Sequence, residues 1–365
     1  MELKKIQTDK GWKVEIVEAG ESISRLWIID RQMRIGSCPV LVGGIAGVGT
    51  DPSYRNQGLS RRVMEASVEL MRRADYDVSM LFGIEDFYHK FGFATCMPER
   101  RIYLRTRNAE RATKQRTIRS MRKSDFARIT RLYNRENAAR TASVVRDRTW
   151  NGFSMGSFFG IEAKTQVVLD ARERVCGYVT YDDVDRHCRA AEVGGQGDEV
   201  FSTILHFLAR RAIRLRREKL SLSMPADHPF AHFCRHFGYR ESTHFDRNAG
   251  PMGRLINLRT LLEKILPVLE KRWGADGRDR GLAISTELGS ALLGWKRGRL
   301  ILDSDGLKAL KVGIDQDAFI QLAMGYQTAE DLKSRGKLKT GRAGLALLAR
   351  LFPPQTAHMW WSDRF

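Results

Sequence analysis

The sequence predicts a mixed α/β (α+β) protein, in which two copies of one α/β unit precede a smaller α+β unit and mixed sheets are flanked by helices. Short strand-like runs alternate with amphipathic stretches along the chain. The segment 86–93 (DFYHKFGF) has a second copy at 232–239 (HFCRHFGY). After Met252 the order of strand-like and helical stretches no longer follows that of the two copies. Because 365 residues exceed what one hydrophobic core usually organises, we expect three domains, at residues 1–110, 111–252 and 253–365.

The first hundred residues read as an antiparallel start to a sheet, followed by a helix, a strand and a turn. From Leu59 onward, apolar residues recur at helical spacing over about four turns. The polar stretch 31–36 reads as a hairpin-like connection. The expected elements are strands at 13–17, 24–29, 39–48 and 78–82, a long helix from residue 59 and a short helix at 87–90.

The rest of the chain repeats this arrangement once and then departs from it. The expected elements of the second unit are strands at 166–169, 175–181 and 220–224 and a helix at 200–216. Those of the third unit are helices at 255–266, 316–324 and 343–351 and strands at 300–303 and 311–314.

A candidate anion-binding loop runs from Arg55 to Ser60 (RNQGLS), after a predicted strand and at the start of a predicted helix. Backbone N–H groups at a helix start lack intrahelical partners and carry the positive end of the helix dipole, which suits a pyrophosphate. Gly58 lets the backbone approach a ligand, Ser60 can donate its hydroxyl, and Arg55 supplies charge. Taken alone, the pattern also fits an ordinary turn with a helix cap.

The second copy has a different loop at the corresponding place. Residues 194–199 (GGQGDE) contain glycine but no arginine, and Asp198 and Glu199 would repel a pyrophosphate. We therefore expect the second unit to be structural.

The order of strand, RxxGxS loop, amphipathic helix, strand and FY..FGF turn resembles the acetyl-CoA-binding core of GNAT acetyltransferases. The resemblance continues through a second, degenerate GNAT unit and a C-terminal unit similar to sterol carrier proteins, carried by KVGIDQDAF (311–319) and WWSDRF (360–365). This order is that of the Eis-like (enhanced intracellular survival) acetyltransferases, and it covers nearly the whole chain. It implies an N-acetyltransferase with acetyl-CoA as co-substrate, and a C-terminal tail that reaches the active site.

The resemblance also implies the catalytic groups. A tyrosine of the FY..FGF turn acts as general acid in this family and the C-terminal carboxylate as general base, which here are Tyr88 and the carboxylate of Phe365. The chemistry is reasonable, because an attacking amine must lose a proton and a departing thiolate must gain one, and phenol and thiol have similar pKa values. The alternative for Tyr88 is a core aromatic residue beside Phe87 and Phe91.

The resemblance further implies that backbone groups of the central strand and of the anion-binding loop hold acetyl-CoA. The implied cofactor-binding residues are Val48, Gly49, Thr50, Arg55, Asn56, Gln57, Gly58, Leu59, Ser60, Arg61, Gly83 and Ile84. A buried strand residue would look the same at Val48 without any ligand.

Two features depart from the resemblance. Only about forty residues precede the strand expected at 39–48, fewer than a GNAT domain uses for its first strands and two helices, so we expect an acceptor side that is open or differently built. The penultimate residue is Arg364, where an acid would help to hold a polycationic amine. An aminoglycoside-like acceptor is therefore not expected.

The net charge of +19 raises the question of polyanionic partners. Residues 101–150 hold fifteen Lys/Arg against four Asp/Glu, yet they lack interleaved aromatics and any recognisable nucleic-acid module. A solvated basic face or an oligomer contact is the favoured interpretation, and we do not expect nucleic-acid binding. The resemblance implies a homo-oligomer, such as a hexamer.

The cysteines and the apolar segments bear on metal binding, on cellular location and on membrane insertion. Five scattered cysteines without CxxC or Cys/His spacing argue against a metal site and favour reduced thiols in the cytoplasm. The longest apolar stretch, 38–49, falls well below the roughly 20 residues of a membrane helix. The alternative to an enzyme is a non-catalytic protein that binds a lipid or another ligand in its sterol-carrier-like unit.

Overall fold

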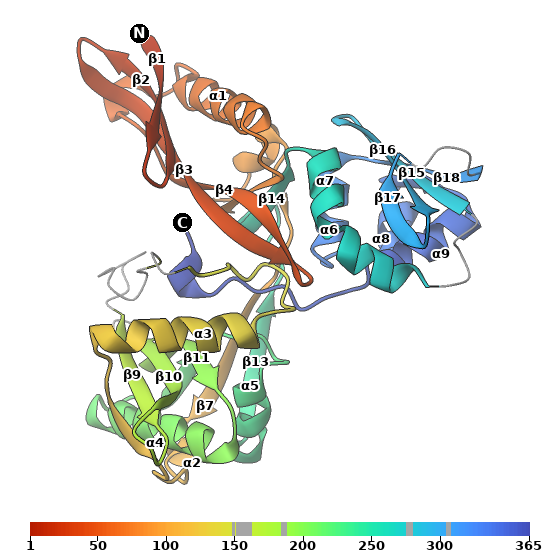
Figure 1. Cartoon of the computed structure of the whole chain (residues 1–365). Helices are drawn as coiled ribbons and strands as arrows, with labels where there is room; N and C mark the ends of the chain where they lie inside the picture. The colour runs from red at the N-terminus through yellow and green to blue at the C-terminus, as the bar shows by residue number, and fades with distance from the viewer. Residues whose placement is uncertain (148–149, 151–162, 184–187, 275–279, 304–307) are drawn as a thin grey trace.

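The computed structural model describes residues 1–147, 150, 163–183, 188–274, 280–303 and 308–365. Within them the chain forms two seven-stranded sheets and one five-stranded sheet, each flanked by helices (Figure 1). The predicted fold class, mixed sheets flanked by helices, is confirmed.

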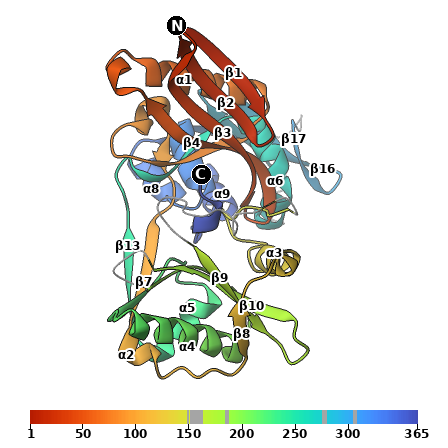
Figure 2. The same ribbon diagram turned by 90° about the vertical axis from the view of Figure 1, so that its left-hand side faces the viewer.

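The first sheet has the strand order β1-β2-β3-β4-β5-β14-β6. Its strands β1 to β4 form an antiparallel meander, seen side by side in Figure 2, and only β4 and β5 run parallel. The strands are β1 (Glu2–Thr8), β2 (Gly11–Glu18), β3 (Glu21–Ile35), β4 (Cys38–Thr50), β5 (Val78–Gly83), β6 (Ala94–Thr95) and β14 (Gly250–Leu255). Helix α1 (Leu59–Arg73) buries Val63, Met64 and Met71 against one face, and α6 (Leu258–Trp273) packs on β4 from the other.

The second sheet has the order β13-β7-β12-β11-β10-β9-β8. The strands are β7 (Glu99–Arg105), β8 (Thr117–Ser120), β9 (Lys164–Leu169), β10 (Val175–Asp182), β11 (Cys188–Gly195), β12 (Lys219–Leu222) and β13 (Tyr239–His244). Helix α3 (Phe126–Glu136) covers one face, and α4 (Asp198–Arg214) with the short α2 (Thr106–Ala109) and α5 (Pro229–Cys234) covers the other.

The first two units exchange strands. Strand β7 leaves the first unit and pairs between β13 and β12 of the second sheet. Strand β14 leaves the second unit and pairs between β5 and β6 of the first sheet. The domain boundaries expected near residues 110 and 252 therefore lie beside strands that have crossed over, and the two units are bound together by main-chain hydrogen bonds.

The third unit is a small α+β structure whose core is continuous with the first unit. One buried cluster joins Val42 of β4 and Met80 of β5 to Trp273 of α6 and Phe319 of α7. The sheet, in the order β17-β16-β15-β18-β19, packs with α6 to α9. The elements are β15 (Arg280–Thr286), β16 (Gly289–Lys296), β17 (Arg299–Leu302), β18 (Lys308–Ile314), β19 (Leu338–Thr340), α7 (Gln316–Ala323), α8 (Ala329–Ser334) and α9 (Arg342–Leu351).

Two predicted elements differ from the structure for identifiable reasons. The predicted hairpin is present, but its connection is shorter than the expected 31–36: β3 continues to Ile35, opposite Cys38, and only Gly36 and Ser37 separate it from β4. The helix predicted from residue 255 starts at Leu258, because Leu255 ends the crossed-over strand β14. The first difference arises where residues from the second unit cover the strand: Arg34 is buried and its guanidinium donates to the carbonyl of Val144 at 3.0 Å.

Candidate active site

Strands β4 and β5 diverge at the centre of the first sheet. They pair only from Val42 opposite Val78 to Gly44 opposite Met80. Beyond that point no described strand pairs with the β5-facing side of residues 45–50. We call this opening the β4–β5 fork. Its free backbone edge can pair with an extended ligand as a further strand would.

A β-bulge changes the direction of the β4 backbone within the fork. Trp27 of β3 pairs with Ala46 while Arg25 pairs with Gly49, so two residues of β4, Gly47 and Val48, lie opposite one residue of β3. Gly47 has φ +56°, and a Cβ there would lie 2.7 Å from the Trp27 ring. Only glycine suits this position. The bulge includes Val48 and directly precedes Gly49 and Thr50; these three predicted backbone ligands are partly exposed.

The predicted anion-binding loop lies where β4 leads into α1. Gly58 is the N-cap of α1 with φ +74°, and neither a side-chain cap nor an acidic residue occupies the first turn. Hydrogen bonding within the helix begins with the Arg62 N–H, which donates to the Gly58 carbonyl. The preceding N–H groups of Leu59, Ser60 and Arg61 therefore remain available to an anion.

Side chains fix this helix start to the strand. The hydroxyls of Ser60 and Thr50 are 2.7 Å apart, and Thr50 also contacts the Ser24 hydroxyl at 2.9 Å. The backbone edge of the fork thus continues directly into the uncapped helix. Asn56 and Gln57 are exposed beside it, and Asn56 has φ +61°.

The equivalent helix of the second unit is closed to anions. Its N-cap, Gly197, also has positive φ (+90°), but Asp198 and Glu199 occupy the first turn of α4. Arg116 forms an ion pair with Glu199. Carboxylates there repel a phosphate, which agrees with the predicted structural role of this unit.

Tyr88 lies at the end of β5, on the α1 side of the sheet. It begins a 3-10 helix (Tyr88–Phe91), and a Cβ on Gly83 would lie 2.7 Å from its ring. The ring meets Phe87 edge-on at a centroid separation of 4.9 Å. Burial raises the pKa of the Tyr88 phenol, so the group stays protonated at neutral pH. Ile84, the other predicted residue here, is 68% exposed at the strand end.

The ring of Phe365 lies on the opposite face of the sheet, at the base of the fork. A Cβ on Gly44 would come within 2.2 Å of this ring, and its centroid is 6.3 Å from that of Phe82. Phe82 packs with the Phe365 cluster, whereas Tyr88 packs with the α1 cluster. The structure thus brings the two predicted catalytic residues to one fork from its two faces.

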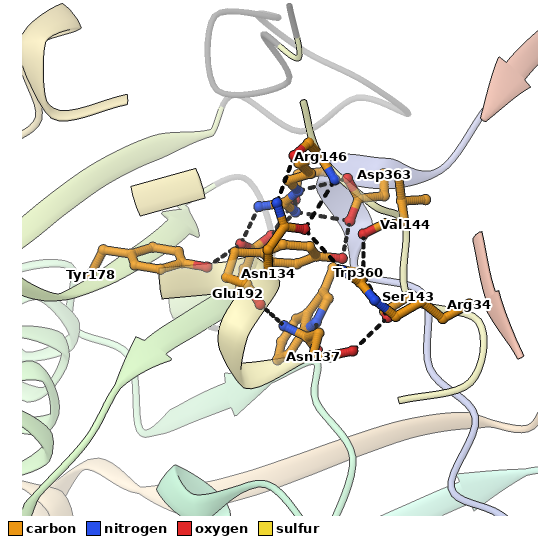
Figure 3. Close-up of polar contacts among 12 residues, drawn as sticks. Arg34, Asn134, Asn137, Ser143, Val144, Arg146, Tyr178, Glu192, Trp360 and Asp363 are labelled. Atoms are coloured by element: carbon orange, nitrogen blue, oxygen red, sulfur yellow. Dashed lines mark hydrogen bonds and ion pairs between the residues drawn. The ribbon is translucent and has the colours of Figure 1, made fainter. Parts of the chain in front are cut away.

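A buried charge network holds the C-terminal tail (residues 356–365) in this place (Figure 3). The guanidinium of Arg146 pairs with Glu192 at 2.7 Å and with Asp363 at 2.9 Å, and all three side chains are fully buried. Tyr133 donates to Asp363 and Tyr178 donates to Glu192. Burial raises the pKa of Asp363, opposed by the charge of Arg146. The network thus joins Glu192 of the second sheet to Asp363 in the last 3-10 turn of the chain.

Two further anchors flank this network. The indole N–H of Trp360 donates to the side chain of Asn137 at 3.0 Å. Arg364 pairs with Glu99 at the start of the crossed-over β7 at 2.9 Å. The C-terminus therefore lies between the first sheet and α3 (Figure 1). No motif indicated these partners, because they come from three units far apart in sequence.

Residues 1–58, all of which the structure describes, form the strands β1 to β4 and no α-helix. Strands β1 and β2 join in a hairpin in which Thr8 pairs with Gly11. A cavity of about 430 Å³ lies between this hairpin, β3, the tail and the residues Val144, Val145, Asp147 and Trp150. The cavity is thus walled by the first unit, the second unit and the tail, and the open or differently built acceptor side stays a prediction.

Among the described residues, no group of three or more His, Cys, Asp or Glu side chains is arranged to hold a metal ion. All five cysteines are free. None of the described helices is long and apolar enough to cross a membrane.

Comparisons with known proteins agree with this geometry. Residues 1–96 match the model of the acetyltransferase (GNAT) domain family. Among curated proteins no match is found. Over nearly its whole length the chain is similar in fold to several solved structures.

Two of them are GCN5-related N-acetyltransferases. The protein from Anabaena variabilis has 16% identity and a TM-score of 0.76, with 97% of this chain and 89% of that chain covered. The protein from Kribbella flavida has 16% identity and a TM-score of 0.72, with 97% and 88% covered. Eis1 from Mycobacterium abscessus has 15% identity and a TM-score of 0.65, with 99% and 92% covered. At such identities the likeness shows the fold alone.

Proposed function

Since residues 1–96 carry a GNAT acetyltransferase domain, we propose that the chain transfers the acetyl group of acetyl-CoA to a primary amine of a small molecule, a peptide or a protein lysine. One observation carries the proposal. The unpaired edge of β4 leads through the Thr50–Ser60 hydroxyl contact of 2.7 Å into an uncapped helix start. The pantetheine arm would pair with Val48 to Thr50, and the pyrophosphate would bind the N–H groups of residues 59–61 beside Arg55.

The reaction needs one proton removed and one supplied. The amine nitrogen attacks the thioester carbonyl, a C–N bond forms and the C–S bond breaks. We assign removal of the amine proton to the carboxylate of Phe365 and protonation of the CoA thiolate to Tyr88. Their placement on opposite faces of the fork supports this division, because the attacking nitrogen and the departing sulfur are different substituents of the tetrahedral carbon and a separate group can serve each.

The fold similarity over 99% of the chain to Eis1 from Mycobacterium abscessus supports the Eis-like organisation. On that basis we infer a degenerate GNAT unit in the middle of the chain and a sterol-carrier-like unit at its end. A homo-oligomer and a cytoplasmic location belong to the same inference. The second unit has Cys234 where Tyr88 stands in the first; it is fully buried, and burial raises the pKa of its thiol. We therefore infer one active site per chain.

The test uses a matched pair of glycines. Gly58 and Gly197 are both helix N-caps with positive φ, and a Cβ on either meets no atom within 4 Å. Leucine at Gly58 would adopt a left-handed backbone conformation (φ 74°, ψ 8°), and leucine at Gly197 would be strained at least as much, because φ 90° with ψ 148° is a conformation almost restricted to glycine. Calorimetric titration with acetyl-CoA should show binding weakened about tenfold or more in Gly58→Leu by lost backbone approach, and unchanged binding in Gly197→Leu.

Two results would count against the proposal. Equal losses in the two variants would mean that the loop is not the binding site. No acetyl-CoA binding by the native chain would favour the non-catalytic, lipid-binding alternative.

A further inference from the structure

The cavity of about 430 Å³ beside the tail is lined by two arginines, Arg31 of β3 and Arg364 of the tail. It adjoins the proposed reaction centre. Ile29 lines the cavity and is the cross-strand partner of Gly44, on which the Phe365 ring rests. Directly opposed residues have Cβ atoms about 5 Å apart. A molecule in the cavity would therefore reach the base of the fork.

Both arginines have hydrogen-bonding capacity left over. Among the described residues, the Nε–H of Arg31 is buried without a hydrogen-bond partner, and its guanidinium donates only to the backbone carbonyl of Asp30, at 3.0 Å. No carboxylate of the described residues forms an ion pair with it. The Arg364 side chain is 8% exposed and pairs with Glu99, yet its Nε–H is also buried without a partner there. These unsatisfied Nε–H groups show that neither guanidinium has its hydrogen-bonding capacity fully used by the described residues.

The charged side chains that line the cavity are of both signs. They are the cations Lys10, Arg31 and Arg364 and the carboxylates Asp9, Asp30 and Asp147. Asp30 already accepts from the Tyr76 hydroxyl and Asp147 accepts from the Trp150 N–H. A polycation would meet three positive groups here, and a simple anion would meet three negative ones. A molecule carrying both a cationic and an anionic group matches the lining best.

We propose that the acceptor is a small amine that also carries a carboxylate, of the amino-acid or short-peptide class, with its carboxylate held by Arg31 and Arg364. The volume suits a small molecule. This inference rests on the proposed acetyl transfer and narrows its acceptor class. The carboxylate contacts the guanidinium groups of the two arginines where they line the cavity, while the amine extends toward the fork, where the terminal carboxylate of Phe365 takes its proton.

The experiment compares ω-amino carboxylates of increasing chain length with neutral n-alkylamines of matched length, at saturating acetyl-CoA. We expect kcat/KM to be at least tenfold higher for the carboxylates. Arg31→Gln should raise KM for the carboxylates roughly tenfold to a hundredfold, as expected for a lost charged hydrogen bond, and leave the alkylamines unchanged. Arg240→Gln, an exposed arginine on β13, is the matched control.

Calorimetry with the same ω-amino carboxylates in the presence of CoA gives a second readout that does not require turnover. Arg31→Gln should weaken this binding by the same factor. The inference is overturned if alkylamines react as well as carboxylates, if Arg31→Gln affects both classes equally, or if no carboxylate binds. Acetylation of alkylamines alone would leave the proposed acetyl transfer standing, whereas loss of acetyl-CoA binding would remove both.

Discussion

The aromatic ring of Phe365 rests on the backbone of Gly44, so closely that a Cβ on Gly44 would lie 2.2 Å from the ring. No other residue type fits under the ring without moving it. The last residue of the chain is thereby fixed on the strand that opens the β4–β5 fork. A substitution at Gly44 should report on the tail without touching any polar group.

Gly44→Ala should lower turnover by about 10²-fold, because displacement of a catalytic group by about 1 Å has effects of this size. Overpacking should cost about 1–3 kcal/mol of stability. The measurement is steady-state kinetics combined with thermal unfolding. Gly313→Ala is the control, since a Cβ there meets its nearest neighbour at 3.8 Å; comparable kinetics in the two variants would show that the position of the tail is unimportant.

Tyr88→Phe should lower kcat by roughly 10²–10⁴-fold, the range of general acid catalysis, with nearly unchanged affinity for acetyl-CoA. Burial raises the pKa of the phenol above its ordinary value near 10. Tyr88 therefore remains a proton donor below pH 10, and activity that depends on it is lost only as pH rises beyond that range. A pH–rate profile with a tyrosine-dependent decline near neutrality, or full activity in the variant, would contradict the assignment.

Arg146→Met should strongly destabilise the protein, because it leaves Glu192 and Asp363 buried without a counter-charge. Breaking such buried pairs costs about 3–5 kcal/mol. The matched control is Arg174→Met, whose exposed pair with Asp170 is screened by solvent and contributes little to stability. Thermal unfolding measures both variants, and only Arg146→Met should show a large loss of stability.

The same variant tests the anchoring of the tail. Adding Glu192→Gln and Asp363→Asn to Arg146→Met removes the uncompensated charges and should recover much of the stability, yet not the turnover. Recovery of both would mean that the network stabilises the fold without positioning the tail.

Local sequence patterns are sufficient to predict the parts of the site that are contiguous in the chain. The helix from Leu59, the strand before it and the Tyr88 turn lie where apolar spacing and the Phe-Gly-Phe turn predict them. The contrast between the uncapped α1 and the acidic start of α4 is also visible in sequence. These features depend on neighbouring residues, so local patterns capture them.

Long-range pairing escapes such prediction. Arg146 lies in the basic segment 101–150, whose composition favours a solvated face, but its partners Glu192 and Asp363 convert it into a buried ion pair. The exchange of β7 and β14 likewise leaves no periodic trace, because a strand has the same alternation in either sheet. The position of the tail follows from these contacts and could be anticipated only through family resemblance.

The role of the chain end can be tested by changing the carboxylate alone. Phe365 is 4% exposed, and its ring, Trp360 and the Asp363 network should hold the tail whether or not the terminus is charged. Replacing the terminal carboxylate by an amide through peptide ligation keeps every side chain and removes only the base. We expect turnover to fall by roughly 10²–10⁴-fold with the thermal transition and acetyl-CoA affinity nearly unchanged. Adding a few residues after Phe365 should lower turnover in the same way. The same addition before Met1, which is 53% exposed, should leave turnover unchanged. If the amidated chain acetylates amines as fast as the native chain, the terminal carboxylate is not the base, and the rings of the tail serve only to close the core.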